Sequence, residues 1–246
     1  MDRLIYTAMT GAKHIMEQQA NTAHNLANVS TTGFRAQLDT FRAVPVLSET
    51  MPTRAFVVDS TMGADFTQGA LQQTGRALDV AVQGKGWIAV QMEDGSEAYT
   101  RQGSLKTSEN GVLQTAAGLS VLGDGGPISI PPDVNVAIAS DGTISSTERA
   151  GKPGQANVIG RIKLVNPPEE SLVRGDDGLF RVKGGEAADA DPNVRVAAGA
   201  LEGSNVNAVD AMVTMISLGR AFEMHMSLLK NAESNAAKAA QLMNLS

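Results

Sequence analysis

Proline and glycine are concentrated in the middle of this 246-residue chain. All nine prolines lie between Pro45 and Pro192, and only three of the 25 glycines fall outside residues 63–203. Proline breaks a helix and glycine weakens one, so only the two ends of the chain have a composition that permits long, uninterrupted helices. The sequence therefore predicts helical ends and a middle region rich in turns.

Each end carries a stripe of apolar and small side chains spaced alternately by three and four residues. In the N-terminal stripe, residues 5–29, this spacing is typical of a coiled-coil seam, and the turn-forming residues 28–33 end it. The stripe over residues 206–243 predicts a second helix of about 40 residues, with Ser204 or Asn205 as its N-cap. Such a length is greater than that of most globular helices and favours a coiled coil.

The terminal helices also carry few charged residues, which is unusual for helices exposed to water. A second apolar set on the C-terminal helix is expected to widen its buried face; it comprises Val209, Val213, Ile216 and Leu228. We expect the two helices to pair with each other and with copies or relatives of the chain in an assembly. An ordinary two-helix bundle on one domain is the alternative.

The middle of the chain alternates short apolar runs with turn signals. Several runs have the period of two that is typical of strands, and five Asp-Gly or Asn-Gly dipeptides mark hairpins. The predicted fold class is α+β, with a helical coiled-coil domain made of residues 1–35 and 201–246 and an antiparallel, hairpin-rich β domain over residues 67–200. Residues 36–66 are predicted to form an extended connector, with a strand near residues 56–58 left open.

Composition and motifs indicate no catalytic chemistry. The absence of cysteine excludes disulfides, thiol nucleophiles and Cys-ligated zinc, and a net charge of −6 without a basic block argues against nucleic-acid binding. The three histidines, His14, His24 and His225, do not have metal-ligand spacing. We therefore expect no catalytic residues, cofactor, metal or small-molecule substrate. No segment is long and apolar enough to predict membrane insertion, and the N-terminal stripe is predicted to remain in the mature protein because no cleavage site follows it.

Three segments resemble signatures of the flagellar rod and hook proteins. Residues 24–35, HNLANVSTTGFR, are similar to the N-terminal signature N-N-L-A-N-x-x-T-x-G-F-K/R, with His24 in place of the usual Asn. Residues 201–206, LEGSNV, and the residues after them resemble the C-terminal signature, with Gly219 where Gln is more common. The segments between residues 78 and 131 resemble landmarks of the family's β domain, so the resemblance covers the whole chain in order.

Membership would imply a structural, non-enzymatic subunit of the bacterial flagellar basal-body rod. In such proteins the terminal helices form a coiled coil that lines the inner tube, and the β domain lies outside it. The subunit is exported by the flagellar type III apparatus without cleavage of a signal peptide. It assembles in the periplasm with other rod proteins and with copies of itself into the drive shaft that transmits torque from motor to hook.

Other functions remain as alternatives. Residues 1–12 look most like the opening of proximal-rod members of the family, and a distal-rod member is the closest competitor. A secreted hydrolase or sugar-binding β protein and a Met-rich helical adaptor are the more distant alternatives. Under the rod hypothesis the residues expected at assembly interfaces come from the two stripes and signatures: Ile5, Ala8, Ala12, Ile15, Asn25, Leu26, Asn28, Gly33, Phe34, Ser204, Asn205, Val206, Met212, Met215, Ile216, Arg220, Phe222, Met226 and Leu229.

Overall fold

The computed structural model describes residues 2–45, 55–148 and 157–243, and the chain forms two compact units. The helix–hairpin unit contains Met1–Asn28, Gln37–Asp65 and Val206–Ser246. The β unit contains Val29–Ala36 and Phe66–Asn205. The chain therefore passes from one unit to the other four times, after residues 28, 36, 65 and 205.

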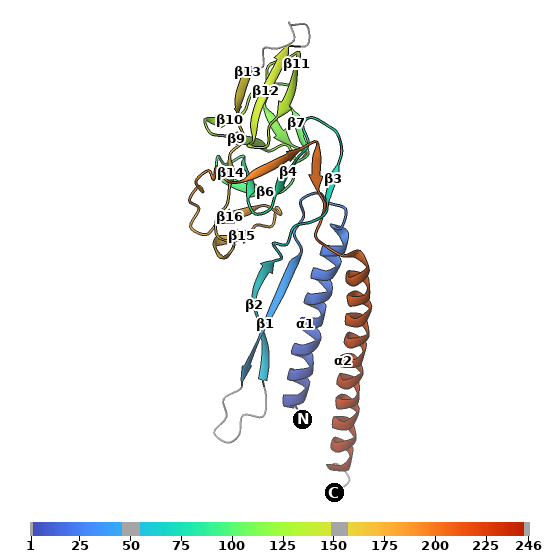
Figure 1. The fold of residues 1–246 in the computed structure, drawn as a ribbon. Coiled ribbons are helices and arrows are strands. Elements are labelled where there is room, and N and C mark those ends of the chain that lie inside the picture. The colour runs from blue at the N-terminus through green and yellow to red at the C-terminus, as the bar shows by residue number, and fades with distance from the viewer. Residues whose placement is uncertain (1, 46–54, 149–156, 244–246) are drawn as a thin grey trace. The chain divides into compact units, whose positions relative to one another are not determined.

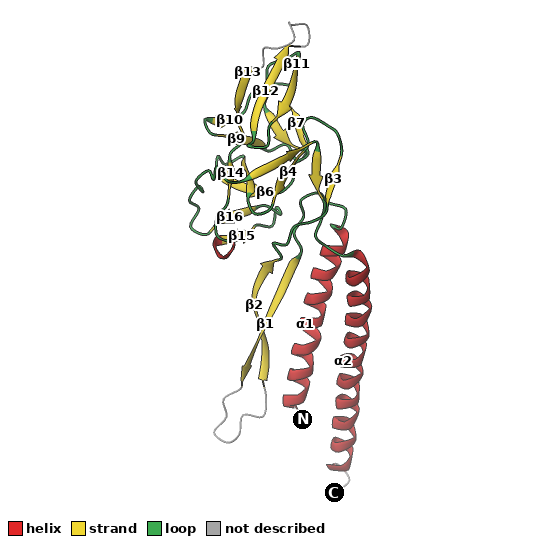
Figure 2. Cartoon of the chain, in the orientation of Figure 1, coloured by secondary structure: helices red, strands yellow, loops and turns green. Residues whose placement is uncertain are grey.

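The helix–hairpin unit is built from two helices and one antiparallel hairpin (Figures 1 and 2). Its elements are α1 (Asp2–Ala27), β1 (Gln37–Pro45), β2 (Ala55–Ala64) and α2 (Ala208–Met243). The helices run antiparallel, side by side, and α1 also packs against both strands of the hairpin. The pairing of β1 with β2 contains one irregularity, between Thr40 and Phe41.

Local sequence explains where each helix begins and ends. Asn28 closes α1, because both its backbone N–H and its side-chain amide donate to the carbonyl of His24, at 3.2 and 2.9 Å. The N-cap of α2 is Asn207, whose Oδ1 accepts the backbone N–H of Val209 at 3.0 Å. The expectation that Ser204 or Asn205 would cap this helix is wrong by two residues or more.

The predicted fold class, with two long terminal helices pairing as a coiled coil, is also wrong. The described residues form two α-helices and a β-rich central region, but α1 has only 26 residues, against 36 in α2. The face of α1 is divided between two neighbours: small residues such as Ala8 and Ala12 are buried, whereas Asn21 and Asn25 hydrogen-bond to Asp39 and Gln37 of β1. A stripe of three-four spacing does not specify what covers it, and here a hairpin shares that role with α2.

The β unit is antiparallel throughout its described strand pairs. Its larger sheet has the order β15-β16-β6-β5-β9-β8-β7, with β10 paired to β9 and β14 to β5. A three-stranded sheet, β11-β12-β13, and the pairs β17-β4 and β18-β3 complete it. The bounds are β3 (Leu71–Gln73), β4 (Val80–Gln83), β5 (Trp87–Gln91), β6 (Glu97–Thr100), β7 (Leu105–Thr107), β8 (Leu113–Thr115), β9 (Ser120–Gly123), β10 (Gly126–Pro127), β11 (Val134–Ile138), β12 (Thr143–Glu148), β13 (Asn157–Arg161), β14 (Leu164–Val165), η1 (Glu169–Ser171), β15 (Leu172–Arg174), β16 (Phe180–Val182), β17 (Arg195–Ala198) and β18 (Ala200–Glu202).

One apolar core joins the sheets of the β unit. Ile88, Val121 and Ile144, from three different strands, are fully buried in the same cluster. Burial of a side chain of this size stabilises a fold by about 1.5–3 kcal/mol. The β unit therefore has the core of an independent domain.

Residues 36–66, predicted as an extended connector, contain β1 and β2 in their described part, and β2 includes the strand left open near residues 56–58. The terminal helical domain of residues 1–35 and 201–246 and the β domain of residues 67–200 stay predictions about domain organisation. The side chains of residues 40–62 lie outside the described part of the structure.

Candidate functional site

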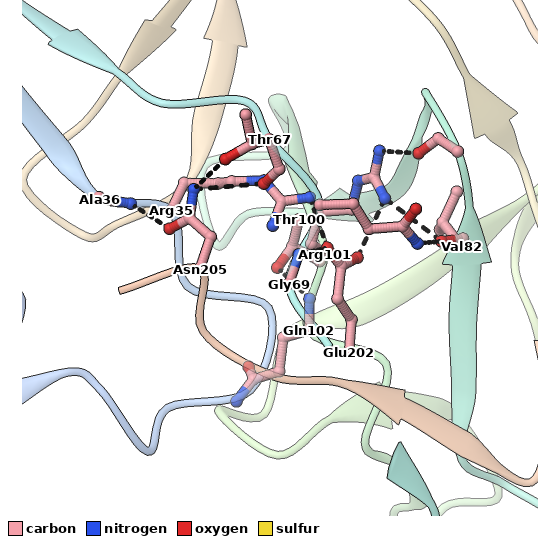
Figure 3. Close-up of polar contacts among 12 residues, drawn as sticks. Arg35, Ala36, Thr67, Gly69, Val82, Thr100, Arg101, Gln102, Glu202 and Asn205 are labelled. Atoms are coloured by element: carbon pink, nitrogen blue, oxygen red, sulfur yellow. Dashed lines mark hydrogen bonds and ion pairs between the residues drawn. The ribbon is translucent and has the colours of Figure 1, made fainter. Parts of the chain in front are cut away.

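Three segments that carry the sequence signatures meet inside the β unit at one carboxylate (Figure 3). Glu202, at the end of β18, forms ion pairs with Arg35, which precedes β1 in the chain, and with Arg101, which follows β6. Arg35 Nη2 lies 2.6 Å from Glu202 Oε1, and Arg101 Nη1 lies 3.0 Å from Oε2. We call these three side chains the carboxylate hub.

Backbone groups complete the surroundings of Glu202. The N–H of Gly69 donates to Oε1 at 3.0 Å, and the N–H of Gly33 donates to the backbone carbonyl of Glu202 at 2.8 Å. Arg101 also donates to the carbonyls of Val82 and Gly84, at 3.3 and 2.6 Å. The carboxylate hub therefore connects five separate stretches of the β unit.

The hub has two buried cations for one buried anion. The side chains of Arg35 and Glu202 are fully buried, and that of Arg101 is 4% exposed. Burial lowers the pKa of Arg101, the charge of Glu202 opposes that effect, and the charge of Arg35 adds to it. Arg35 Nε and Nη1 have no hydrogen-bond partner among the described residues, so this guanidinium depends on Glu202.

Aromatic rings cover the hub. The guanidinium of Arg101 lies 5.3 Å from the ring centroid of Trp87, which also contacts Phe66 and Phe180. Arg174 lies over the ring of Phe34 at 4.6 Å; Phe34 immediately precedes Arg35 in the chain. Trp87 is the only tryptophan of the chain, so its fluorescence reports on this region.

A second polar junction lies beside the hub, at Asn205 (Figure 3). Its Oδ1 accepts the backbone N–H of Ala36 at 2.7 Å, and its Nδ2 donates to the carbonyl of Thr67 at 3.2 Å. The side-chain amide of Asn205 therefore links its own segment to the segments that contain Ala36 and Thr67. We call this arrangement the Asn205 clasp.

Gly33 has a role that other residues cannot take. Its φ is +69°, and an added Cβ would lie 2.4 Å from the backbone carbon of Arg101. Only glycine combines that backbone conformation with so close an approach. Gly33 therefore lets the segment before Arg35 lie directly against the segment that carries Arg101.

The residues predicted from the N-terminal stripe differ in their surroundings. Ala8 and Ala12 are buried, Ile15 and Leu26 are half-buried, and the side chain of Ile5 lies outside the described part. Another predicted interface residue, Asn25, exchanges two hydrogen bonds with the backbone of Gln37, at 2.8 and 2.9 Å. The amide of Asn28 bonds to the carbonyl of His24.

The residues predicted from the C-terminal stripe fall into two groups. Met215, Phe222 and Leu229 are half-buried, as are Ser204 and Val206 before the helix. By contrast, Met212, Ile216, Arg220 and Met226 are exposed. The second apolar set, Val209, Val213, Ile216 and Leu228, is also exposed, so the expectation that it widens the buried face is wrong for the chain by itself.

Of the predicted interface residues, Gly33, Phe34 and Asn205 are brought together near the hub, and their role in assembly stays a prediction. Sequence reasoning missed Arg35, Arg101 and Glu202 as site residues. A signal was present: apart from His24, each is the only charged residue in its signature, in HNLANVSTTGFR, YTRQG and LEGSNV respectively. A charge that is buried needs a partner of opposite sign, and these three residues supply two positive charges and one negative charge.

The described part of the chain has neither a membrane-spanning helix nor a metal-binding cluster. No described helix has the length and apolarity needed to cross a membrane. Among the described residues, no group of three or more His, Asp or Glu side chains is arranged to hold a metal ion.

Known proteins resemble the chain along its whole length. Residues 81–146 match the family described as "Flagellar hook protein FlgE/F/G D1 domain", and residues 197–242 match "Flagellar basal body rod FlgEFG protein C-terminal". The flagellar basal-body rod protein FlgF of Escherichia coli K12 is 48% identical, and that of Salmonella typhimurium LT2 46% identical, each over all of both chains. The flagellar basal-body rod protein FlgG of Agrobacterium fabrum is 30% identical over 95% of this chain and 97% of its own length.

Proposed function

The chain belongs to the FlgF family of flagellar basal-body rod proteins, and we propose that it is a structural subunit of the proximal part of that rod. The observation that carries this function is the similarity to FlgF proteins over the full length of both chains. Both terminal segments and the middle are included in it, so the likeness is not confined to one domain. The protein is located in the flagellar basal body.

The proximal position is supported by the difference between two groups of relatives. Identity to FlgF proteins reaches 48%, whereas the FlgG protein of Agrobacterium fabrum is 30% identical. A distal-rod role is therefore the weaker alternative. The role of the subunit is to form part of the drive shaft that transmits torque from the motor to the hook.

The partners proposed are other rod proteins and copies of the same chain. The exposed side of α2 supports this proposal, because a row of large apolar side chains along one helix is unusual on a surface that stays in water. Val209, Val213 and Ile216 are 67%, 62% and 59% exposed. Burial of these side chains between neighbouring subunits would stabilise an axial assembly.

Delivery by the flagellar type III apparatus, with ordering of the terminal helices on assembly, is part of the same proposal. The helix–hairpin unit combines two segments near the start of the chain with one from its far end, so it is complete only when both ends of the chain are present. A subunit of this kind needs neither a catalytic residue nor a cofactor. We therefore propose a structural role and not an enzymatic one.

Deletion of the gene, followed by imaging of basal bodies, tests the function. The expected result is the absence of complete rods and the loss of motility, both restored by the full chain. Complete rods in the deletion strain would refute the proposal. Truncation of residues 1–35 and 206–246 is expected to abolish motility, and retained motility would also count against it.

A further inference from the structure

The four passages of the chain between its two units define where a load carried along the backbone enters the β unit. They follow residues 28, 36, 65 and 205. The β-unit ends of three of these passages are Ala36, Phe66 and Asn205. In a shaft that transmits torque, a force carried along the backbone from the helix–hairpin unit reaches the β unit at these three ends and at Val29.

The Asn205 clasp joins these ends to one another inside the β unit. Asn205 is itself the last residue before the fourth passage, and its side chain bonds directly to Ala36, the last residue before the second. Its Nδ2 reaches the carbonyl of Thr67, one residue after Phe66 begins the return from the third. Pulling either of the other two backbones away from Asn205 would therefore require breaking a hydrogen bond to its side chain.

The carboxylate hub anchors the same three backbones one step deeper. Arg35 is adjacent to Ala36, Gly69 is two residues beyond Thr67, and Glu202 is three residues before Asn205. Glu202 binds both of the others through one carboxylate, at 2.6 Å for the guanidinium and 3.0 Å for the N–H. Charge-assisted hydrogen bonds and ion pairs in a buried site resist separation more strongly than neutral contacts in water.

We propose that the Asn205 clasp and the carboxylate hub form a joint that carries mechanical load. The joint holds the three β-unit ends, at Ala36, Phe66 and Asn205, together when torque is applied. Asn205 and Glu202 are the residues whose side chains hold the three backbones in place. This inference rests on the proposed rod function. It adds that these contacts are required under mechanical load beyond what folding alone requires.

Asn205→Ala in the full chain tests the joint, and Asn207→Ala is its matched control. The same side chain is removed at both positions, but Asn207 caps α2 through Val209 and Asp210 and bonds to none of the three β-unit ends. Each variant replaces the native chain in motile cells. Rod completeness is scored by imaging of basal bodies, and rotation is scored in dilute and in viscous medium.

The expected result for Asn205→Ala is complete rods and rotation in dilute medium, with loss of rotation or shedding of filaments in viscous medium. Asn207→Ala is expected to show no additional loss of rotation in viscous medium: whatever its rotation in dilute medium, relative to the native chain, it keeps the same relative rotation in viscous medium. Equal rotation of the two variants at high viscosity would overturn the inference. So would loss of rods by Asn205→Ala in dilute medium, because that outcome indicates a role in folding or assembly alone.

Asn205→Asp keeps the test informative if the alanine variant does not fold, which purified protein reveals through Trp87 fluorescence. The aspartate retains an acceptor for the N–H of Ala36 but sets a carboxylate oxygen against the carbonyl of Thr67 in place of the donor, so rotation is expected to fail at a lower viscosity than in the native chain. Rotation that fails only at the same viscosity as in the native chain would overturn the inference. The proposed function is tested separately by the gene deletion. Complete rods and motility in the deletion strain would refute the proposed function.

Discussion

The two units of the molecule differ in how far they bury their large apolar side chains. In the β unit, Ile88 and Val121 are completely buried. In the helix–hairpin unit, Met212 and Ile216 of α2 remain 52% and 59% exposed. The β unit thus buries a large apolar core, although single side chains such as Val158 stay exposed, whereas α2 exposes several large apolar side chains along one helix. The comparison separates the stability of the subunit from its capacity to assemble.

The largest effect is expected from the buried charge of the β unit. Glu202→Gln leaves two buried guanidinium groups without an anion and is expected to lower the free energy of unfolding by about 3–5 kcal/mol. Urea unfolding followed by Trp87 fluorescence measures it. Glu97→Gln is the control, because Glu97 pairs with Lys163 at 2.8 Å where both side chains still touch solvent. Equal losses in the two variants would show that Glu202 is no more than an ordinary ion-pair partner.

Two isoleucine truncations compare the units directly. Ile88→Ala is expected to cost about 2–5 kcal/mol, because a buried side chain leaves a cavity. Ile216→Ala is expected to stay within about 0.5 kcal/mol in the monomer, as substitutions at exposed sites do. Thermal unfolding of both purified variants checks the contrast. A large loss in the Ile216 variant would mean that the exposed face of α2 is already covered in the isolated chain.

The β unit should also lose stability in alkali through Tyr99. Burial raises the pKa of Tyr99 to about 12 from its usual 10.0. The folded state therefore resists an ionisation that the unfolded state undergoes, and this stabilisation is complete below pH 10 and lost as the pH rises towards 12. The loss is expected to be roughly 2–3 kcal/mol, because the pKa differs between the two states by about 2 and a tenfold change in proton affinity corresponds to about 1.4 kcal/mol.

Tyr99→Phe is the matched variant for this measurement. It lacks the ionisable hydroxyl, which accepts the backbone N–H of Ala188 at 2.7 Å, and it is expected to show a smaller decline in stability between pH 10 and 12. Urea unfolding at several pH values provides the test. Parallel declines in both proteins would contradict the assignment to Tyr99.

The smallest effects distinguish two glycines within the helix–hairpin unit. Gly219→Ala in α2 meets no atom within 4 Å and is expected to stabilise the helix by up to about 1 kcal/mol. In Gly11→Ala the new Cβ would lie 2.7 Å from Cε1 of His225, so the gain is expected to vanish. Circular dichroism during heating measures both variants. Addition of His225→Ala should restore part of the gain, and an equal gain in both single variants would contradict the close packing.

Turns and strands of the β unit could be predicted from the sequence because each depends on a few neighbouring residues. At four of the five Asp-Gly and Asn-Gly dipeptides the glycine has a positive φ, as hairpin turns require. The strands β5 and β11 coincide with two of the short apolar runs in the middle of the chain, WIAV at residues 87–90 and VNVAI at residues 134–138. The hub was not readable in this way, since Arg101 and Glu202 are 101 residues apart and only the fold brings them together.

The helical end shows why periodicity alone was insufficient. The stripe of three-four spacing predicted the helices, but it contained no information about their partner. The hairpin β1-β2 took part of the place assigned to α2, through tertiary contacts such as those of Asn25 with Gln37. The exposed side of α2 is the converse case, in which large apolar side chains of the pattern stay exposed among the described residues.

The Arg35–Glu202 ion pair has a consequence for the kinetics of folding. In the unfolded chain, pairing α1 with α2 must close a loop that includes the whole β unit, and the entropic cost rises with the logarithm of loop length. Once Arg35 and Glu202 are paired, each helix is tethered by only a few residues, from Ala27 to Arg35 on one side and from Glu202 to Ala208 on the other. Short flexible tethers give effective concentrations in the mM range. The β unit thus works as an intramolecular template that converts an encounter between distant ends of the chain into a local one.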